Sequence, residues 1–151
     1  VSIRSTVFLG AALLGSAPLG AQTTEAAPAP PAPFTPAEEA RYMELGRNVT
    51  RWFFNGAADS MYAAASEDTR KAMGGVEGIR EQMDEITNRA GYRTLVVEEK
   101  MTRRDGMPQF WHEALFSDYT NEPLVFRWIF NEQGELVGAG INPKSKARKD
   151  G

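Results

Sequence analysis

Residues 92–117, YRTLVVEEKMTRRDGMPQFWHEALFS, decide the fold. Two runs rich in β-branched and aromatic residues flank Asp105-Gly106. Asp-Gly is favoured in two-residue hairpin turns because both central positions of such a turn need positive φ. The stretch therefore predicts two antiparallel strands, 92–104 and 107–117, joined by a tight turn.

A two-residue turn also sets which residues of the two strands face each other. Pairing Arg104 with Met107 places Glu99 directly opposite His112. The same register predicts four further pairs: Met101 with Phe110, Lys100 with Trp111, Val97 with Ala114, and Leu95 with Phe116.

The third and fourth strands are predicted at residues 124–130 and 136–141. They flank Asn131-Glu132-Gln133-Gly134, which fits a type I turn closed by a glycine bulge. If Phe116 pairs with Leu124, Trp128 comes to face His112. The same pairing predicts these neighbours: Phe110 with Phe130, Glu113 with Arg127, Leu136 with Phe130, Gly138 with Trp128, and Gly140 with Phe126.

The residues before this sheet are predicted to be helical. Thr35-Pro36-Ala37-Glu38 combines a capping hydroxyl, a proline in the first turn and a carboxylate three residues after the cap, so we expect a helix over 36–54. Its apolar stripe is Tyr42, Leu45, Val49, Trp52 and Phe53. Two shorter helices follow, one over 57–65 that ends at Ser66-Glu67-Asp68 and one from about 76 to 90. The fold class is α+β, with three N-terminal helices packed on a curved four-stranded antiparallel sheet.

The N-terminal residues 1–21 have the pattern of a cleavable signal peptide. Arg4 is followed by an apolar run over 7–14 and by the small-residue pattern Leu19-Gly20-Ala21. The alternative, a retained anchor, is disfavoured because the apolar run is too short to span a bilayer. We expect cleavage near Ala21 and a periplasmic or secreted product.

Three further segments follow. Residues 22–36 are rich in proline and alanine and predict an extended spacer. The folded domain is expected over 37–143, and 144–151 form a basic tail.

Composition excludes several classes of site. The chain has 151 residues, a net charge of −3, no cysteine and one histidine. Disulfides, thiolate or histidine-rich metal sites and a basic nucleic-acid surface are therefore not expected. No phosphate-binding or hydrolase motif is present. We predict no cofactor, no metal, no nucleic-acid partner and no stable membrane insertion after signal cleavage.

The predicted register separates the sheet into two faces. One face, toward the helices, is expected to line a concave apolar pocket for a small apolar ligand. Its candidate residues are Tyr42, Tyr62, Glu99, Phe110, His112, Phe126 and Trp128. The opposite face mixes apolar and charged residues, and no remaining element is expected to cover it, so we predict a homodimer interface there. Its candidate residues are Trp111, Leu115, Val125, Arg127 and Ile129.

Glu99 and His112 are the only candidates for chemistry. A carboxylate opposite an imidazole can act as a general acid/base pair. The competing interpretation is a cross-strand ion pair near the mouth of the pocket, and the sequence favours it.

Two segments carry a resemblance to a known family. They are residues 54–62, FNGAADSMY, after the first helix, and residues 130–138, FNEQGELVG, near the end. With the order of helices and strands, they resemble the nuclear transport factor 2-like (cystatin-like cone) superfamily over roughly residues 37–143. The resemblance implies a cone-shaped α+β fold with a pocket between helices and sheet, and frequent dimers.

The resemblance does not imply catalysis, because no motif of an enzymatic branch matches residue by residue. The function we expect is an exported non-catalytic binding or protein-interaction domain. The alternative is a small lyase, isomerase or cyclase, in which Glu99 and His112 exchange protons and Tyr42 or Tyr62 polarises a carbonyl.

Overall fold

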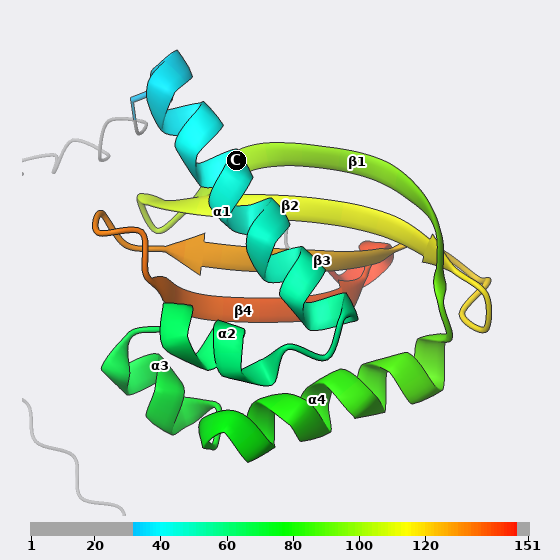
Figure 1. Cartoon of the computed structure of the whole chain (residues 1–151). Coiled ribbons are helices and arrows are strands. Elements are labelled where there is room, and N and C mark those ends of the chain that lie inside the picture. Colours follow the sequence, from blue (N-terminus) through cyan, green and yellow to red (C-terminus); the bar gives the residue numbers. More distant parts are fainter. Residues whose placement is uncertain (1–31, 148–151) are drawn as a thin grey trace, which may run out of the picture. The chain divides into compact units, whose positions relative to one another are not determined.

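The computed structural model describes residues 32–147, which form an α+β arrangement of four helices followed by one four-stranded antiparallel sheet (Figure 1). This confirms the predicted class and the four strands. The helices are α1 (Pro36–Phe54), α2 (Ala58–Ala64), α3 (Glu67–Ala72) and α4 (Gly75–Ala90). The strands are β1 (Arg93–Arg104), β2 (Met107–Phe116), β3 (Leu124–Phe130) and β4 (Leu136–Pro143), followed by a short 3₁₀ turn, η1 (Lys144–Lys146).

Helix α1 begins with the predicted capping box. The Thr35 hydroxyl accepts from the Glu38 backbone N–H at 3.2 Å, and the Glu38 carboxylate accepts from the Thr35 N–H at 2.9 Å. These bonds satisfy amide groups that a helix start leaves without partners. The helix ends at Phe54, as expected, and Asn55 is its C-cap.

The predicted count of three helices is wrong, because Ser66-Glu67-Asp68 ends one helix and also begins another. The Ser66 hydroxyl accepts from the Thr69 N–H at 3.4 Å and caps α3. The Ser66 N–H donates to the Leu136 carbonyl of β4 and so does not continue α2. Serine is favoured at such helix starts. Gly74 and Gly75 then take positive φ angles, which turns the chain into α4.

The β1–β2 hairpin has the predicted turn. Asp105 and Gly106 both have positive φ, 51° and 83°. The register is confirmed from the turn as far as Glu99, which faces His112. Glu98 still pairs in the same register, with Glu113, but from Val97 onward the prediction is wrong, because β1 contains two irregularities, between Val96 and Glu98 and between Arg93 and Leu95. Each inserts an extra residue. The observed pairs are Val96 with Ala114, Leu95 with Leu115, and Arg93 with Phe116.

The register of β3 against β2 differs from the prediction by two residues. His112 faces Phe126, and Phe110 faces Trp128. A shift of two keeps every side chain on its expected face. On the other face, Arg127 lies opposite Trp111, and not opposite Glu113 as predicted.

Strand β4 carries a further correction. A bulge between Ile129 and Phe130 shifts the register by one. The pairing of Leu136 with Phe130 is confirmed, but Ala139 lies opposite Trp128 and Ile141 opposite Phe126. The predicted neighbours, Gly138 and Gly140, lie opposite Ile129 and Arg127 instead.

The helices lie over one face of the sheet, and the main core lies between them (Figure 1). Helix α1 crosses β2 so closely that a Cβ atom added to Gly46 would lie 2.1 Å from the Phe110 ring. The buried apolar residues of this core include Tyr42, Val49, Phe53, Met61, Ile79, Met83, Phe110, Phe126, Trp128 and Leu136.

The face of the sheet away from the helices is not bare, so the premise of the predicted interface is wrong. Trp111, Val125 and Arg127 are buried, whereas Leu115 and Ile129 are half-buried. After β4 the chain turns back through η1, which brings Ala147 against Trp111 and Val125. The Lys144 ammonium bonds the buried Glu113 carboxylate at 2.7 Å. The homodimer itself stays a prediction.

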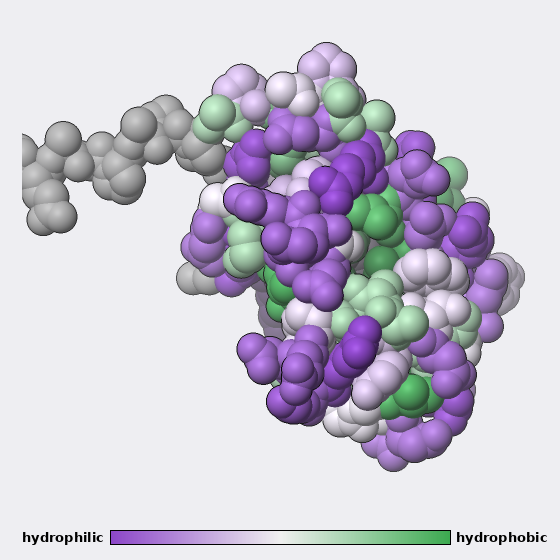
Figure 2. Space-filling model, turned by 60° about the vertical axis from the view of Figure 1, so that its left-hand side comes forward, coloured by the Kyte–Doolittle hydropathy of each residue, from purple (hydrophilic) through white to green (hydrophobic). Residues whose placement is uncertain are grey.

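On the face shown in Figure 2, hydrophilic side chains predominate, and hydrophobic residues reach the surface in limited patches. Within residues 32–147, none of the helices combines the length and the apolar character needed to cross a membrane.

Candidate functional site

The predicted pair lies beside a cleft between the second half of α1 and the first half of β1. The cleft has a volume of about 280 Å³. Its lining comes from α1 and the residue after it on one side and from β1 on the other: Arg47, Thr50, Arg51, Phe54, Asn55, Arg93, Val96 and Glu99.

Glu99 and His112 are in contact, as the sequence predicts. His112 Nδ1 lies 3.0 Å from Glu99 Oε1. The imidazole is only 1% exposed, whereas Glu99 is half-buried. The other Glu99 oxygen, Oε2, accepts from Arg47 Nε at 2.8 Å. The pair thus links α1 to the sheet.

A second arginine occupies the other nitrogen of the ring. Arg93 Nη1 lies 3.2 Å from His112 Nε2, and its guanidinium stands over the Phe54 ring at 4.7 Å. Arginine is always a donor, so Nε2 must accept, and the proton of a neutral ring belongs on Nδ1. His112 therefore donates to Glu99. We call the chain of contacts Arg47–Glu99–His112–Arg93 the charged network.

The charged network keeps the His112 imidazole neutral and the Glu99 carboxylate ionised. Burial lowers the pKa of His112 below its usual value of 6.5, and the cation of Arg93 lowers it further. Together they outweigh the opposing effect of Glu99. Burial alone would raise the pKa of Glu99, but hydrogen bonds from Arg47 and His112 outweigh it, and the pKa is lowered. A neutral imidazole and an ionised carboxylate follow.

This arrangement constrains the chemistry. A general base needs a free lone pair within reach of its substrate. The only lone pair of the neutral ring points at Arg93, so His112 can take a proton only after Arg93 moves away. Arg93 is exposed and could move, but as described the charged network works as a cross-link, which agrees with the ion-pair interpretation.

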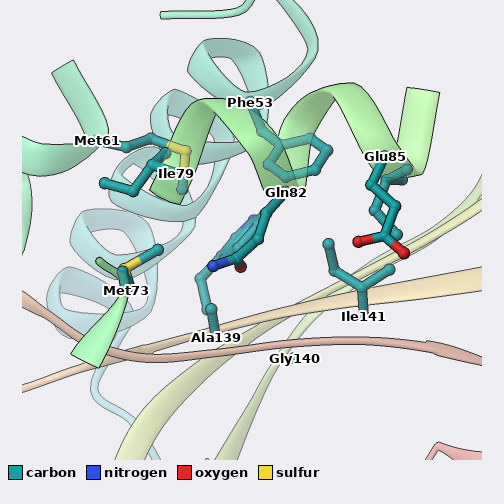
Figure 3. A pocket seen from close by; sticks show the side chains of 11 residues that line it. Phe53, Met61, Met73, Ile79, Gln82, Glu85, Ala139, Gly140 and Ile141 are labelled. Atoms are coloured by element: carbon teal, nitrogen blue, oxygen red, sulfur yellow. The ribbon is translucent and has the colours of Figure 1, made fainter. Parts of the chain in front are cut away.

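A separate apolar cavity of about 270 Å³ lies between α4 and strands β3 and β4 (Figure 3). Phe53, Met61 and Ile79 reach it from three helices, and Trp128 and Ile141 from the sheet. Two polar side chains of α4, Gln82 and Glu85, extend toward β4 (Figure 3). The remaining lining residues are Met73, Ile86, Ala139 and Gly140.

The Trp128 ring is held in place by a polar contact in the core. Its indole N–H donates to the Thr50 hydroxyl at 2.8 Å, and that hydroxyl donates to the Gly46 carbonyl, also at 2.8 Å. Because both groups are buried, this chain of bonds satisfies them. It leaves an apolar face of the indole for the cavity.

The predicted pocket residues do not share one cavity. Only Trp128 lines the apolar cavity, and Glu99 lines the cleft beside the charged network. Phe110 and Phe126 are fully buried in the core. Three residues remain. His112 lines neither space and belongs to the charged network. Tyr42 donates to the Asn131 carbonyl at 3.2 Å, and Tyr62 lies under the Arg70 guanidinium at 5.0 Å.

Sequence reasoning missed most of the cavity wall. The spacing of Ile79 and Ile86 marks them as the apolar face of α4, but gives no sign that part of this face borders a space. Arg47 and Arg93 were missed for a different reason. When a charged residue lies at an exposed position of a helix or strand, the sequence pattern does not show whether its side chain contacts a buried partner or only solvent.

Neither a metal site nor similarity to a known protein assigns a chemistry to these residues. Among the described residues, no group of three or more His, Asp or Glu side chains could hold a metal ion. Comparisons with protein-family models, with curated protein sequences and with solved structures find no match for this chain.

Proposed function

We propose that this chain is an exported, non-catalytic binding domain that holds a small, largely apolar molecule in the cavity under α4. The observation that carries the proposal is the composition of the cavity wall. Most of the lining residues are aromatic or aliphatic, and Gln82 and Glu85 contribute polar side chains. Ligand sites commonly combine an apolar lining with a few polar groups that orient the ligand.

The size of the cavity limits the ligand. Small-molecule pockets commonly measure about 300–1,000 Å³, so a cavity of about 270 Å³ suits a compact molecule. A bicyclic aromatic alcohol has the required chemistry, because its rings would meet Phe53 and Trp128 while its hydroxyl reaches Glu85 or Gln82.

The proposal also covers the superfamily to which the chain belongs and the cellular compartment in which it acts. The order of helices and antiparallel strands, with a cavity between helices and sheet, supports membership of the nuclear transport factor 2-like superfamily and its cone shape. The pattern of residues 1–21, which lie outside the described residues, supports export to the periplasm or beyond.

One observation favours a second candidate, a small lyase, isomerase or cyclase. It is the 3.0 Å contact between Glu99 and His112 beside an open cleft. This candidate requires Arg93 to leave the ring. It also loses the carbonyl-polarising tyrosines, since Tyr42 bonds a backbone carbonyl and Tyr62 packs under Arg70. The binding function therefore remains our conclusion.

Binding can be measured with 1-naphthol as the probe. We expect saturable 1:1 binding that quenches part of the tryptophan fluorescence, because Trp128 is the one of the three tryptophans that lines the cavity. Ala139→Phe places a ring in the cavity and should weaken binding at least tenfold. Ala63→Phe makes the same change at an exposed position of α2 that does not line the cavity, so it should bind like the wild type.

The two proposed functions separate in the same experiment. His112→Gln should leave naphthol binding unchanged, because His112 does not line the cavity. Equal affinity of the Ala139→Phe and wild-type chains would contradict the binding site. Native mass spectrometry of protein recovered from the periplasm makes two measurements. It detects a retained ligand, and it tests whether the mass of the chain is that expected for a start near Gln22.

A further inference from the structure

The most exposed large hydrophobic side chains gather at the start of β1. Tyr92 is 73% exposed, Leu95 56%, Val96 43% and Val97 46%. Met107, 38% exposed, lies apart from them beside the hairpin turn. Single exposed apolar residues are common, but four within six consecutive residues form a patch that usually marks an interface.

This patch lies on an edge strand. Among the described residues, β1 pairs only with β2, because the strand order is β1-β2-β3-β4. An edge strand presents backbone N–H and C=O groups that can pair with another strand. Natural proteins commonly protect such an edge with charges or bulges. Here two bulges are present, but residues 94–97 carry no charge.

The two bulges arrange the side chains of β1 in an unusual way. Arg93, Val96 and Glu99 pair with Phe116, Ala114 and His112, which lie on the face toward the helices. A regular strand would alternate faces at every residue. Instead, a basic, an apolar and an acidic residue follow one another on the same face at intervals of three.

We propose that β1 pairs antiparallel with β1 of a second copy, around a two-fold axis at Val96. In this register Arg93 lies opposite Glu99 of the second copy, and Val96 lies opposite its own equivalent. Leu95 lies opposite Val97 of the second copy. Opposite charges and apolar pairs facing each other across strands are favourable.

The sequence of β1 favours this register and this partner. A shift of one residue in either direction leaves no residue opposite its own equivalent, and one of the two shifts places Arg93 opposite Lys100 and Leu95 opposite Glu98, which pairs like charges and buries an apolar group against a carboxylate. An isologous contact needs a surface that is complementary to itself. In the register centred on Val96, β1 meets this requirement. The chain's own segment 22–36 is a poor alternative strand, because its prolines lack the N–H donor.

A single engineered cysteine tests the axis, since the chain contains no cysteine. Directly opposed residues have Cβ atoms about 4.5–5.5 Å apart, close to the separation in disulfides, about 3.5–4.5 Å. We expect Val96→Cys in the full chain to form a disulfide-linked dimer under mild oxidation. Met107→Cys is the control, exposed to a similar degree but outside the interface, and should stay mostly monomeric. Equal cross-linking of the two variants would overturn the proposal.

Sedimentation equilibrium of the full chain without cysteine provides the second measurement. We expect the wild type to dimerise. Leu95→Lys should weaken dimerisation at least tenfold, with an unchanged circular dichroism spectrum because Leu95 is exposed. Met107→Lys should dimerise like the wild type. A wild type that stays monomeric at millimolar concentration would overturn the proposal, and would leave the edge of β1 for an unrelated strand. A dimer that Leu95→Lys leaves intact would also overturn it.

Discussion

The charge of His112 depends on three neighbours that act in different directions. Burial and the Arg93 cation disfavour the imidazolium, whereas the Glu99 carboxylate favours it. The sequence predicts the contact of His112 with Glu99 but not the direction in which the pKa of His112 shifts. Neither the burial of the ring nor the position of Arg93 can be derived from the hairpin register. The structure shows that burial dominates, so the ring is neutral at physiological pH.

Two single changes should move the pKa of His112 in opposite directions. Glu99→Gln removes the anion that favours the imidazolium, so the pKa should fall further below 6.5. Arg93→Gln removes the opposing cation, and the pKa should rise. Because His112 is the only histidine of the chain, its imidazole gives one set of NMR signals to titrate. Shifts of the same sign in both variants would contradict the charged network.

Helix α1 contacts the sheet more extensively than any other helix does. Gly46 lets α1 lie directly on Phe110, and Thr50, one turn later, accepts from Trp128. Both residues lie on the buried face of α1. A glycine in a helix interior costs about 1 kcal/mol relative to alanine. Here it is explained by the space that Phe110 occupies.

Gly46→Ala should therefore destabilise the domain, although alanine is the better helix former. Overpacking a core costs about 1–3 kcal/mol, and the gain in helix propensity returns about 1 kcal/mol. We expect a net loss of up to about 2 kcal/mol in urea unfolding. Glu44→Ala, at an exposed position of the same helix, is the control and should change stability little. A more stable Gly46→Ala variant would show that α1 can move away from Phe110.

The elements with a strong local pattern could be predicted from the sequence, and the longer-range details could not. Only five residues separate Glu99 from Asp105-Gly106, so the turn determines that pairing. The bulges in β1 carry no glycine or proline that would mark them. The loop over 117–123 can close with Leu124 opposite Phe116 or Ala114, and only packing decides between the two.

Burial patterns explain the errors at the site. Five of the seven predicted pocket residues were chosen by their face of the sheet and two as tyrosines on the helices, and neither criterion distinguishes a filled core from a cavity. Phe110 and Phe126 fill the core under α1, whereas space remains where α4 passes Trp128. The segment after β4 reads only as a basic tail, yet Lys144 and Ala147 contact the outer face.

At the scale of the whole domain, the charged network couples stability to pH. The folded-state pKa of His112 lies below its usual value, so the unfolded chain binds the proton more readily. The stabilisation is therefore complete above pH 6.5 and is lost as the pH falls through the folded-state pKa. Glu99, whose pKa is also lowered, stabilises the fold above its usual value of 4.5 and contributes a further loss below it.

The free energy of unfolding should accordingly decrease as the pH falls from 7 toward 5. One proton limits the slope to about 1.4 kcal/mol per pH unit. His112→Gln, which can still donate to Glu99 and accept from Arg93, should flatten the profile in this window. Urea titrations at half-unit pH intervals measure it, and an unchanged slope in the variant would assign the effect to other groups.

The strand order β1-β2-β3-β4 also bears on how fast the domain folds. Each strand pairs with its neighbour in the chain, so every ladder can grow from its own connection, and closing a short loop costs little entropy. Docking of α1 is different, since Thr50 and Trp128 are 78 residues apart. Proteins with local contacts fold faster than those that must first close long loops. We therefore expect the β1–β2 hairpin to form early and the packing of α1 on the sheet to form late.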